Sequence, residues 1–208
     1  ETDFQATVIR FCLLLKKKWR NTIKNLFRFF KMLIMKITFR SINQKKTTYL
    51  KAIEWLKNNQ IEGGIAISSK KKIPYPEVTG YTIPALYQWG EKKMARDLSL
   101  WLIGQQNKDG SFSAPDGAPY TFDTAQVVRG FLSALDDLPE VEKPLRKACD
   151  WILKQIQQDG EMTTPSTEMW EGIADNRIHL YVLPSLIQAG EKLNESKYID
   201  AAHHVLNL

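Results

Sequence analysis

Three segments of the chain concentrate carboxyl, amide and aromatic side chains: residues 73–82, 112–126 and 168–181. Carboxyl groups near a Tyr or His can act as the acid and the base in glycoside hydrolysis, elimination or C5 epimerisation. Glu77 is the most suggestive carboxylate, because it follows Pro76 in a rigid loop beside two tyrosines. The candidate catalytic residues are Glu77, Tyr81, Asp123 and His179.

The same segments hold side chains that suit a sugar, since aromatic rings stack on its apolar faces and polar groups bond its hydroxyls. Arg177 could hold the carboxylate of a uronate through two parallel hydrogen bonds. The candidate substrate-binding residues are Tyr75, Tyr120, Gln126, Trp170, Glu171, Arg177 and Tyr181.

Several of these residues also have a purely structural interpretation. Asp123 is well placed as a helix N-cap, where its carboxylate would accept from free backbone N–H groups of the first turn. His179 could be a satisfied core or rim histidine. Tyr81 and Tyr181 each open a predicted helix, so core packing explains them as well as substrate contact does.

The charge of the chain is divided unevenly. Its net charge is +6, but residues 1–50 carry 12 Lys and Arg against Glu1 and Asp3. The remaining 158 residues carry 17 basic and 21 acidic side chains. We therefore expect a basic helical arm over residues 1–45 and a mildly acidic domain over residues 46–208.

The arm has the composition of an amphipathic helix, with aromatic residues beside a basic stripe. Such a helix can lie on an anionic membrane surface, or it can pack on the domain or on a partner. Nucleic acid is not expected, because the aromatic residues do not interleave with the basic ones. The stripe is formed by Lys17, Arg20, Lys24, Arg28 and Lys31.

The domain contains an internal repeat. The segment 83–92 returns as 183–192 with its Pro, Leu, Gln, Gly, Glu and Lys in place. A shorter unit recurs at about half that period, because Trp55, Trp101 and Trp151 each stand nine residues before a glycine. We expect all three tryptophans in the core, where each would lock its helix to a neighbour.

Each unit predicts a helix, an irregular segment and a second helix, so the fold class is all-α. The first helices are polar on one side and end at a glycine turn. They are predicted at Thr47–Gln60, Lys92–Gln106 and Val141–Gln158. The mostly apolar second helices are predicted at Tyr81–Trp89, Thr124–Leu135 and Arg177–Ala189. A last outer helix is predicted at Ser196–Leu208.

These repeats resemble the α/α-toroid superfamily, in particular the repeats of terpene cyclases and protein prenyltransferase β-subunits. The family pattern of an Ala, an aromatic-Leu pair, a Gln and an Asp-Gly-aromatic is matched best by Ala95, Trp101-Leu102, Gln106, Asp109-Gly110 and Phe112. The resemblance implies an incomplete toroid of about three and a half hairpins. A partner chain or missing sequence would supply the hairpins that complete the ring. The resemblance also implies that the three polar segments line one mouth.

The lipid-type signatures of that superfamily are missing from this sequence. Type-II cyclases protonate an alkene with the central carboxylic acid of an Asp-x-Asp-Asp-Thr-Ala segment. The aligned segment here, Thr121-Phe122-Asp123-Thr124-Ala125, contains Asp123 as its single Asp. Prenyltransferases need a zinc site of Asp, Cys and His, and no His is suitably spaced from Cys149. An isoprenoid or terpene activity therefore remains the alternative and not the first expectation.

Residues 75–84 and 122–126 look most like the branch of helical-hairpin toroids that handles sugars. That likeness implies a carbohydrate-processing or carbohydrate-binding protein acting on a cell-surface polysaccharide or its uronate-containing precursor. As an enzyme it would be a hydrolase, lyase or epimerase. The non-catalytic alternative is a scaffold or glycan-binding subunit.

No cofactor and no metal are expected, because phosphate loops, Rossmann glycines and metalloprotease motifs are missing from the sequence. Cys12 and Cys149 match no zinc or redox spacing and fit a reducing compartment. We expect a cytoplasmic protein, peripheral at the inner face of the membrane if the arm binds lipid.

Overall fold

The computed structural model describes residues 46–163 and 181–206, and they are mostly helical. The expected all-α class is therefore confirmed. The chain divides into two compact units, Glu1–Trp55 and Leu56–Leu208. In the first unit, the described residues 46–55 are helical, and the helix continues to residue 58.

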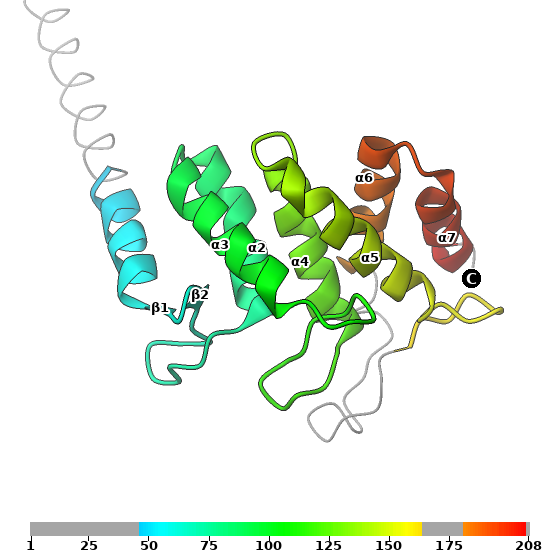
Figure 1. Cartoon of the computed structure of the whole chain (residues 1–208), viewed down its shortest axis with the longest axis horizontal. Helices are drawn as coiled ribbons and strands as arrows, with labels where there is room; N and C mark the ends of the chain where they lie inside the picture. The colour runs from blue at the N-terminus through cyan, green and yellow to red at the C-terminus, as the bar shows by residue number, and fades with distance from the viewer. Residues whose placement is uncertain (1–45, 164–180, 207–208) are drawn as a thin grey trace, which may run out of the picture. The chain divides into compact units, whose positions relative to one another are not determined.

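The second unit contains the helices and short strands that position the candidate site (Figure 1). The strands β1 (Gln60–Ile61) and β2 (Gly64–Ile65) form a small antiparallel pair, in which Gln60 lies opposite Ile65. The helices are α2 (Pro76–Gln88), α3 (Lys92–Gln105), α4 (Thr121–Ala134), α5 (Glu142–Leu153), α6 (Leu183–Leu193) and α7 (Ser196–Leu206), with a 3₁₀ turn η1 at Pro139–Val141.

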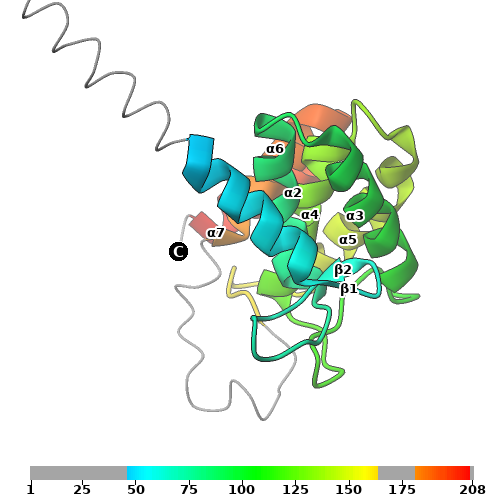
Figure 2. The ribbon, with the colours of Figure 1, turned by 90° about the vertical axis from the view of Figure 1, so that its left-hand side faces the viewer.

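The helices of the second unit form consecutive hairpins arranged in two layers. In one layer α2 packs on α4, and α4 packs on α6. In the other layer α3 lies against α2 and α4, α5 lies against α4, and α7 lies against α6 and α5 (Figures 1 and 2). The apolar side chains of α4 are buried between its neighbours, and they include Val127, Val128 and Phe131.

Two glycines bring α2 and α4 into close contact. A Cβ atom on Gly80 would lie 2.7 Å from the backbone oxygen of Gln126, and one on Gly130 would lie 2.8 Å from the oxygen of Gly80. Side chains at these positions would force the helices apart, because real Cβ atoms do not approach backbone so closely. This close packing sets the beginnings of α2 and α4 next to each other.

Both of these helices begin earlier than the sequence predicted. Helix α2 begins at Pro76 and not at Tyr81, because proline fits the first helical turn, where no backbone N–H partner is needed. Helix α4 begins at Thr121 and not at Thr124. Helix α5, in contrast, ends at Leu153 and not at Gln158, since the following chain folds back to pair Ile156 with Met162.

The predicted N-cap role of Asp123 is wrong. The N-cap position of α4 is occupied by Tyr120, which makes no side-chain capping hydrogen bond, and Asp123 is the third residue of the helix. Its side chain is buried and accepts a hydrogen bond from Tyr75. The carboxyl group is therefore directed to the neighbouring hairpin and not to the end of its own helix.

The repeated Trp-to-Gly spacing corresponds to contacts between successive hairpins. The indole of Trp101 lies against the turn of the preceding hairpin, where a Cβ on Gly64 would come within 2.5 Å of it. In the next repeat, Gln106 donates from its amide to the carbonyl oxygen of Pro144 at 2.8 Å. The indole of Trp151 makes a hydrogen bond to the carboxylate of Asp109. The glycine turns at Gly63-Gly64 and at Gly110 are thus docked on the following helix of the second layer, α3 and α5 respectively.

The expectation that all three tryptophans lie in the core is only partly met. Trp151 is 4% exposed, and Trp101 is partly buried against the glycine turn. Trp55, in contrast, is 42% exposed, so its burial was wrongly predicted. The indole of Trp101 is covered by the glycine turn that precedes its helix. The described residues before Trp55 contain no such turn.

Substitution of Gly110 tests this docking. Gly110 has φ +103°, and a Cβ there would lie 2.3 Å from the oxygen of Lys147. Gly110→Ala combines backbone strain with this overlap, so we expect a loss of about 3 kcal/mol in the free energy of unfolding. Gly117→Ala is the matched control, because Gly117 has φ +85° but no atoms near its Cβ position. The control should lose only about 1 kcal/mol in urea unfolding, and equal losses would show that the docking contact contributes nothing.

Candidate active site

The segments that precede α2 and α4 are built in the same way. The backbone N–H of Ile65 donates to the hydroxyl of Thr79 at 2.9 Å, and that of Phe112 donates to Thr124 at 3.2 Å. In each repeat a Tyr stands four residues before the Thr, as Tyr75 and Tyr120. These bonds tie each irregular segment to the first turn of its helix, so residues 73–82 and 112–126 meet at one end of the helix layer.

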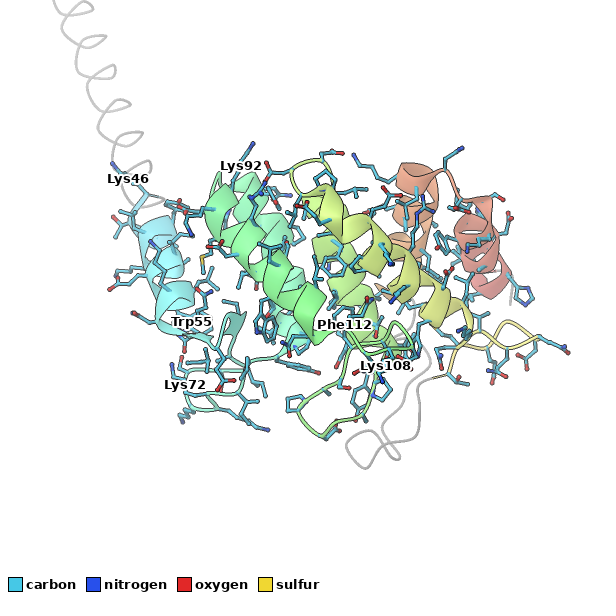
Figure 3. The ribbon with its side chains drawn as sticks, viewed as in Figure 1. Lys46, Trp55, Lys72, Lys92, Lys108 and Phe112 are labelled. Atoms are coloured by element: carbon cyan, nitrogen blue, oxygen red, sulfur yellow. The ribbon has the colours of Figure 1, made fainter. Side chains whose placement is uncertain are left out.

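Phe112 anchors the second of these segments. Its side chain is completely buried, and its ring meets that of Phe131 edge-to-face with centroids 6.0 Å apart (Figure 3). A buried aromatic pair of this kind adds to the stabilisation from area burial alone. The loop between Phe112 and α4 is therefore held at both ends, by this ring and by the helix.

Tyr75 and Asp123 connect the two hairpins through a hydrogen bond, in which the Tyr75 hydroxyl donates to Oδ2 of Asp123. Asp123 is only 4% exposed. Burial raises the pKa of Asp123 to about 7, although the Tyr75 hydrogen bond acts in the opposite direction and the charge of Asp116 adds to the increase. Burial and the nearby carboxylates raise the pKa of Tyr75 well above its usual value, so Tyr75 stays a proton donor in this bond.

Glu77 supplies a second carboxyl group with a raised pKa. It lies in the first turn of α2 and is partly buried. Burial raises the pKa of Glu77 to about 7, and the negative charge of Asp123 contributes to the increase. Two carboxyl groups from neighbouring helices therefore titrate near neutral pH, where one can hold a proton while the other is ionised.

Asp116 is a third carboxyl group of this cluster, and the sequence placed it in the segment 112–126 without a catalytic or binding role. It accepts a hydrogen bond at 2.7 Å from the hydroxyl of the buried Tyr120, and this bond lowers the pKa of Asp116. Asp116 therefore stays ionised and raises the pKa values of Tyr75 and Asp123. In the sequence, Pro115-Asp116-Gly117 indicates only a turn, so the role of Asp116 becomes visible only when the fold brings it to Asp123.

The aromatic candidates lie around the carboxyl groups in different ways. Tyr81 is 45% exposed, and burial and the charge of Glu77 raise its pKa. Tyr181 is 68% exposed, and its ring meets the ring of Phe122 edge-to-face with centroids 6.3 Å apart. Both tyrosines are thus too exposed for the predicted core alternative, and their proposed roles at a substrate stay predictions.

Gln126 differs from the other candidates because its amide is already engaged. It is 4% exposed, and its side-chain oxygen accepts a hydrogen bond from Arg129 at 2.9 Å. Its proposed contact with substrate stays a prediction.

Several predicted residues lie outside the described part of the chain. They are the catalytic candidate His179, the substrate-binding candidates Trp170, Glu171 and Arg177, and the basic stripe of the arm, Lys17, Arg20, Lys24, Arg28 and Lys31.

The described residues carry no group of three or more His, Cys, Asp and Glu side chains arranged to hold a metal ion. Within the same ranges, no helix is long and apolar enough to cross a lipid bilayer. Cys149 is buried, and burial raises the pKa of its thiol to about 12, so it is not a reactive nucleophile.

Tyr75→Phe tests the connection between the two hairpins. The hydroxyl of Tyr75 lowers the pKa of Asp123, so its removal should raise that pKa above about 7. The measurement is a pH titration of the side-chain carboxyl carbon of Asp123 by NMR. Tyr87→Phe is the control, because the hydroxyl of Tyr87 donates to Asp137 at 3.3 Å and not to the carboxyl groups around Asp123. An unchanged pKa in Tyr75→Phe would rule out the hydrogen bond.

Comparison with known proteins adds no family: no protein-family model matches the chain, and no curated protein matches it in sequence.

Proposed function

We propose that this protein is a glycoside hydrolase of the α/α-toroid type, which acts on a cell-surface polysaccharide or its uronate-containing precursor. The observation that carries the proposal is the pair Glu77 and Asp123, which come from the neighbouring helices α2 and α4 and both have a pKa of about 7. Such a pair supplies an acid and a base at neutral pH, and glycoside hydrolysis requires one of each.

The arrangement of the helices supports the toroid assignment. Three consecutive hairpins, α2–α3, α4–α5 and α6–α7, place their first helices in one layer and their second helices in the other. The Trp, Gln and Asp-Gly residues that carry the resemblance make the contacts between successive hairpins. In such a fold, the segments that lead into the inner helices form the mouth, and Glu77 and Asp123 lie at the ends of two of these segments.

The roles of the two carboxyl groups follow from their neighbours. Tyr75 donates a hydrogen bond to Asp123, which favours the ionised form of Asp123. Burial raises the pKa of Glu77, and the charge of an ionised Asp123 adds to the increase, so Glu77 is the group that holds a proton while Asp123 is ionised. Glu77 would give this proton to the leaving-group oxygen as the glycosidic bond breaks. Asp123 would take a proton from the water that adds to the anomeric carbon.

The exposed rings of Tyr81 and Tyr181 support a sugar as the ligand. A pyranose ring has apolar C–H faces and polar edges, so it binds best between aromatic surfaces and hydrogen-bonding groups. Tyr81 lies close enough to Glu77 for the carboxylate to raise its pKa. Tyr181 meets Phe122, which is next to Asp123 in α4.

The electrostatics of Asp123 argue against the terpene-cyclase alternative. Protonation of an alkene requires an unusually strong acid, whereas a carboxyl group with a pKa of about 7 is a weaker acid than an ordinary aspartic acid. A proton donor of this strength suits transfer to and from oxygen near neutral pH.

A panel of oligosaccharides tests the proposed function. Full-length protein is incubated with neutral and uronate-containing oligosaccharides, and the products are separated by chromatography. Hydrolysis yields two saturated fragments, whereas an elimination yields an unsaturated uronate with ultraviolet absorbance. A glycan that binds without turnover would instead favour the glycan-binding subunit, and a panel without binding or turnover would contradict the proposal.

A further inference from the structure

Residues 66–74 form a small hairpin directly before the candidate site. Ala66 pairs with Pro74 in an antiparallel bridge, and the N–H of Ile67 donates to the oxygen of Ile73 at 3.0 Å. At the tip, the N–H of Lys71 donates to the hydroxyl of Ser68 at 3.0 Å. These bonds give the tip a defined conformation.

This hairpin presents two lysines at its tip, and the next residue, Lys72, is held by the segment that precedes the hairpin. Lys72 donates to Oδ1 of Asn59 at 2.7 Å and to the carbonyl oxygen of Asn58 at 3.2 Å (Figure 3). Lys70 and Lys71 are exposed. Among the described residues, no ion pair involves either of them. Their charges are therefore available to an external anion.

The lysine tip is joined to the active site by a short, fixed connection. Only four residues lead from Lys71 to Tyr75, which corresponds to at most about 13 Å of extended chain. The N–H of Tyr75 donates to the oxygen of Ile65 at 3.0 Å, which holds the base of the hairpin against β2. A ligand that extends a few sugar units from Glu77 along the hairpin would reach the two lysines.

The corresponding hairpin of the next repeat carries the opposite charge. It is closed by the bridge between Ser113 and Pro119, and its tip carries Asp116. A ligand with several negative charges is therefore repelled by one tip and attracted by the other. The ionised Asp123 also disfavours an anion at the carboxyl pair itself.

We propose that Lys70 and Lys71 form a subsite for the carboxylates of an acidic polysaccharide whose scissile bond lies at Glu77 and Asp123. This subsite rests on the proposed function and adds to it the residues that hold the carboxylates of a uronate-containing substrate. Charged lysine heads on flexible stems suit this task, because successive uronates along a chain present carboxylates at variable angles. The charges of the two lysines favour one orientation of the bound polysaccharide, with its acidic units on the side of the 66–74 hairpin.

The test uses the double variant Lys70→Ala/Lys71→Ala in the full-length protein. The probes are hexasaccharides of galacturonate, of mannuronate and of alternating glucuronate and N-acetylglucosamine, each with its methyl-esterified counterpart. The matched control is Lys143→Ala/Lys147→Ala, which removes two exposed lysines from α5. Affinity is measured by calorimetry at low and at high salt.

We expect the Lys70→Ala/Lys71→Ala variant to bind an acidic hexasaccharide about tenfold more weakly than the wild type at low salt, with little difference at high salt. The methyl esters should bind equally to both proteins, and the α5 control should match the wild type.

Three results would overturn the subsite. In the first, the acidic hexasaccharide binds the variant as tightly as the wild type, while Glu77→Gln still stops its turnover. In the second, the variant loses binding to phosphatidylglycerol vesicles but keeps its glycan affinity, which would make the tip a membrane contact. In the third, the wild type binds none of the hexasaccharides, which removes the subsite, whereas the proposed function fails only if the panel of neutral and uronate-containing oligosaccharides also shows neither binding nor turnover.

Discussion

Glu77→Gln is expected to lower kcat by about 100- to 10,000-fold on the oligosaccharide that the wild-type protein hydrolyses, which is the usual loss when a general acid is removed. Glutamine has nearly the same shape as glutamic acid but cannot give up a proton to the leaving-group oxygen. Because the substrate still meets the same rings and hydroxyls, KM should change much less than kcat. Asp123→Asn should lower kcat by a similar factor, since the amide cannot accept a proton from water.

The control for this prediction is Glu140→Gln. Glu140 is exposed in η1, beyond the end of α4 that lies away from Asp123. This variant should keep the activity of the wild type. If Glu77→Gln and Glu140→Gln have equal kcat values, Glu77 is not the acid. If Glu77→Gln instead loses activity by unfolding, its melting temperature will fall as well.

The second large effect concerns stability, which should fall as the pH rises from about 4 to about 8. The folded state keeps a proton on Asp123 up to a pH of about 7, whereas the unfolded chain releases it near the usual value of 3.8. The folded state therefore binds more protons in this interval, and raising the pH favours unfolding. One unit of pKa corresponds to about 1.4 kcal/mol, so Asp123 alone should lower the free energy of unfolding by about 4 kcal/mol across this interval. Glu77 acts in the same direction.

Asp123→Asn isolates this contribution, because other groups also titrate between these pH values. An amide does not ionise, and its oxygen can still accept the hydrogen bond of Tyr75. Urea unfolding should show the variant close to the wild type at pH 4.5 and more stable than the wild type at pH 8. A variant that is less stable than the wild type at pH 8 would mean that the ionised carboxylate stabilises the fold, which would contradict a raised pKa.

The sequence predicted the hairpins and their contacts more successfully than the beginnings of the helices. The spacing from Trp101 to Gly110 recurs because each glycine turn docks on the next helix, and this local pattern is visible in one sequence. The beginning of α2 was missed by five residues because Pro76 fits the first turn of a helix as well as a loop. Likewise, a short acidic residue near a helix start is often a cap, which explains the wrong assignment of Asp123.

The chemistry of the site could be predicted only in outline. Glu77, Tyr75 and Asp123 were identified by residue type, and the repeat implied that their segments meet. The pKa of Asp123 depends on its burial, on the hydroxyl of Tyr75 and on the charge of Asp116. Tyr75 and Asp123 belong to different hairpins and are 48 positions apart in the sequence, so their contact follows only from the fold. The role of Asp116, a residue of the predicted segment 112–126, was missed for the same reason, since its electrostatic effect on Asp123 exists only in the folded chain.

The most direct test of the acid–base pair is the pH dependence of kcat/KM for hydrolysis by the wild-type protein. One ionised and one protonated carboxyl group predict a bell-shaped profile centred near pH 7, because both groups have pKa values of about 7 in the free protein. Tyr75→Phe should move the acidic limb to higher pH. A profile that is flat between pH 5 and pH 9, or one whose limbs follow the ordinary carboxyl range near pH 4, would contradict the account.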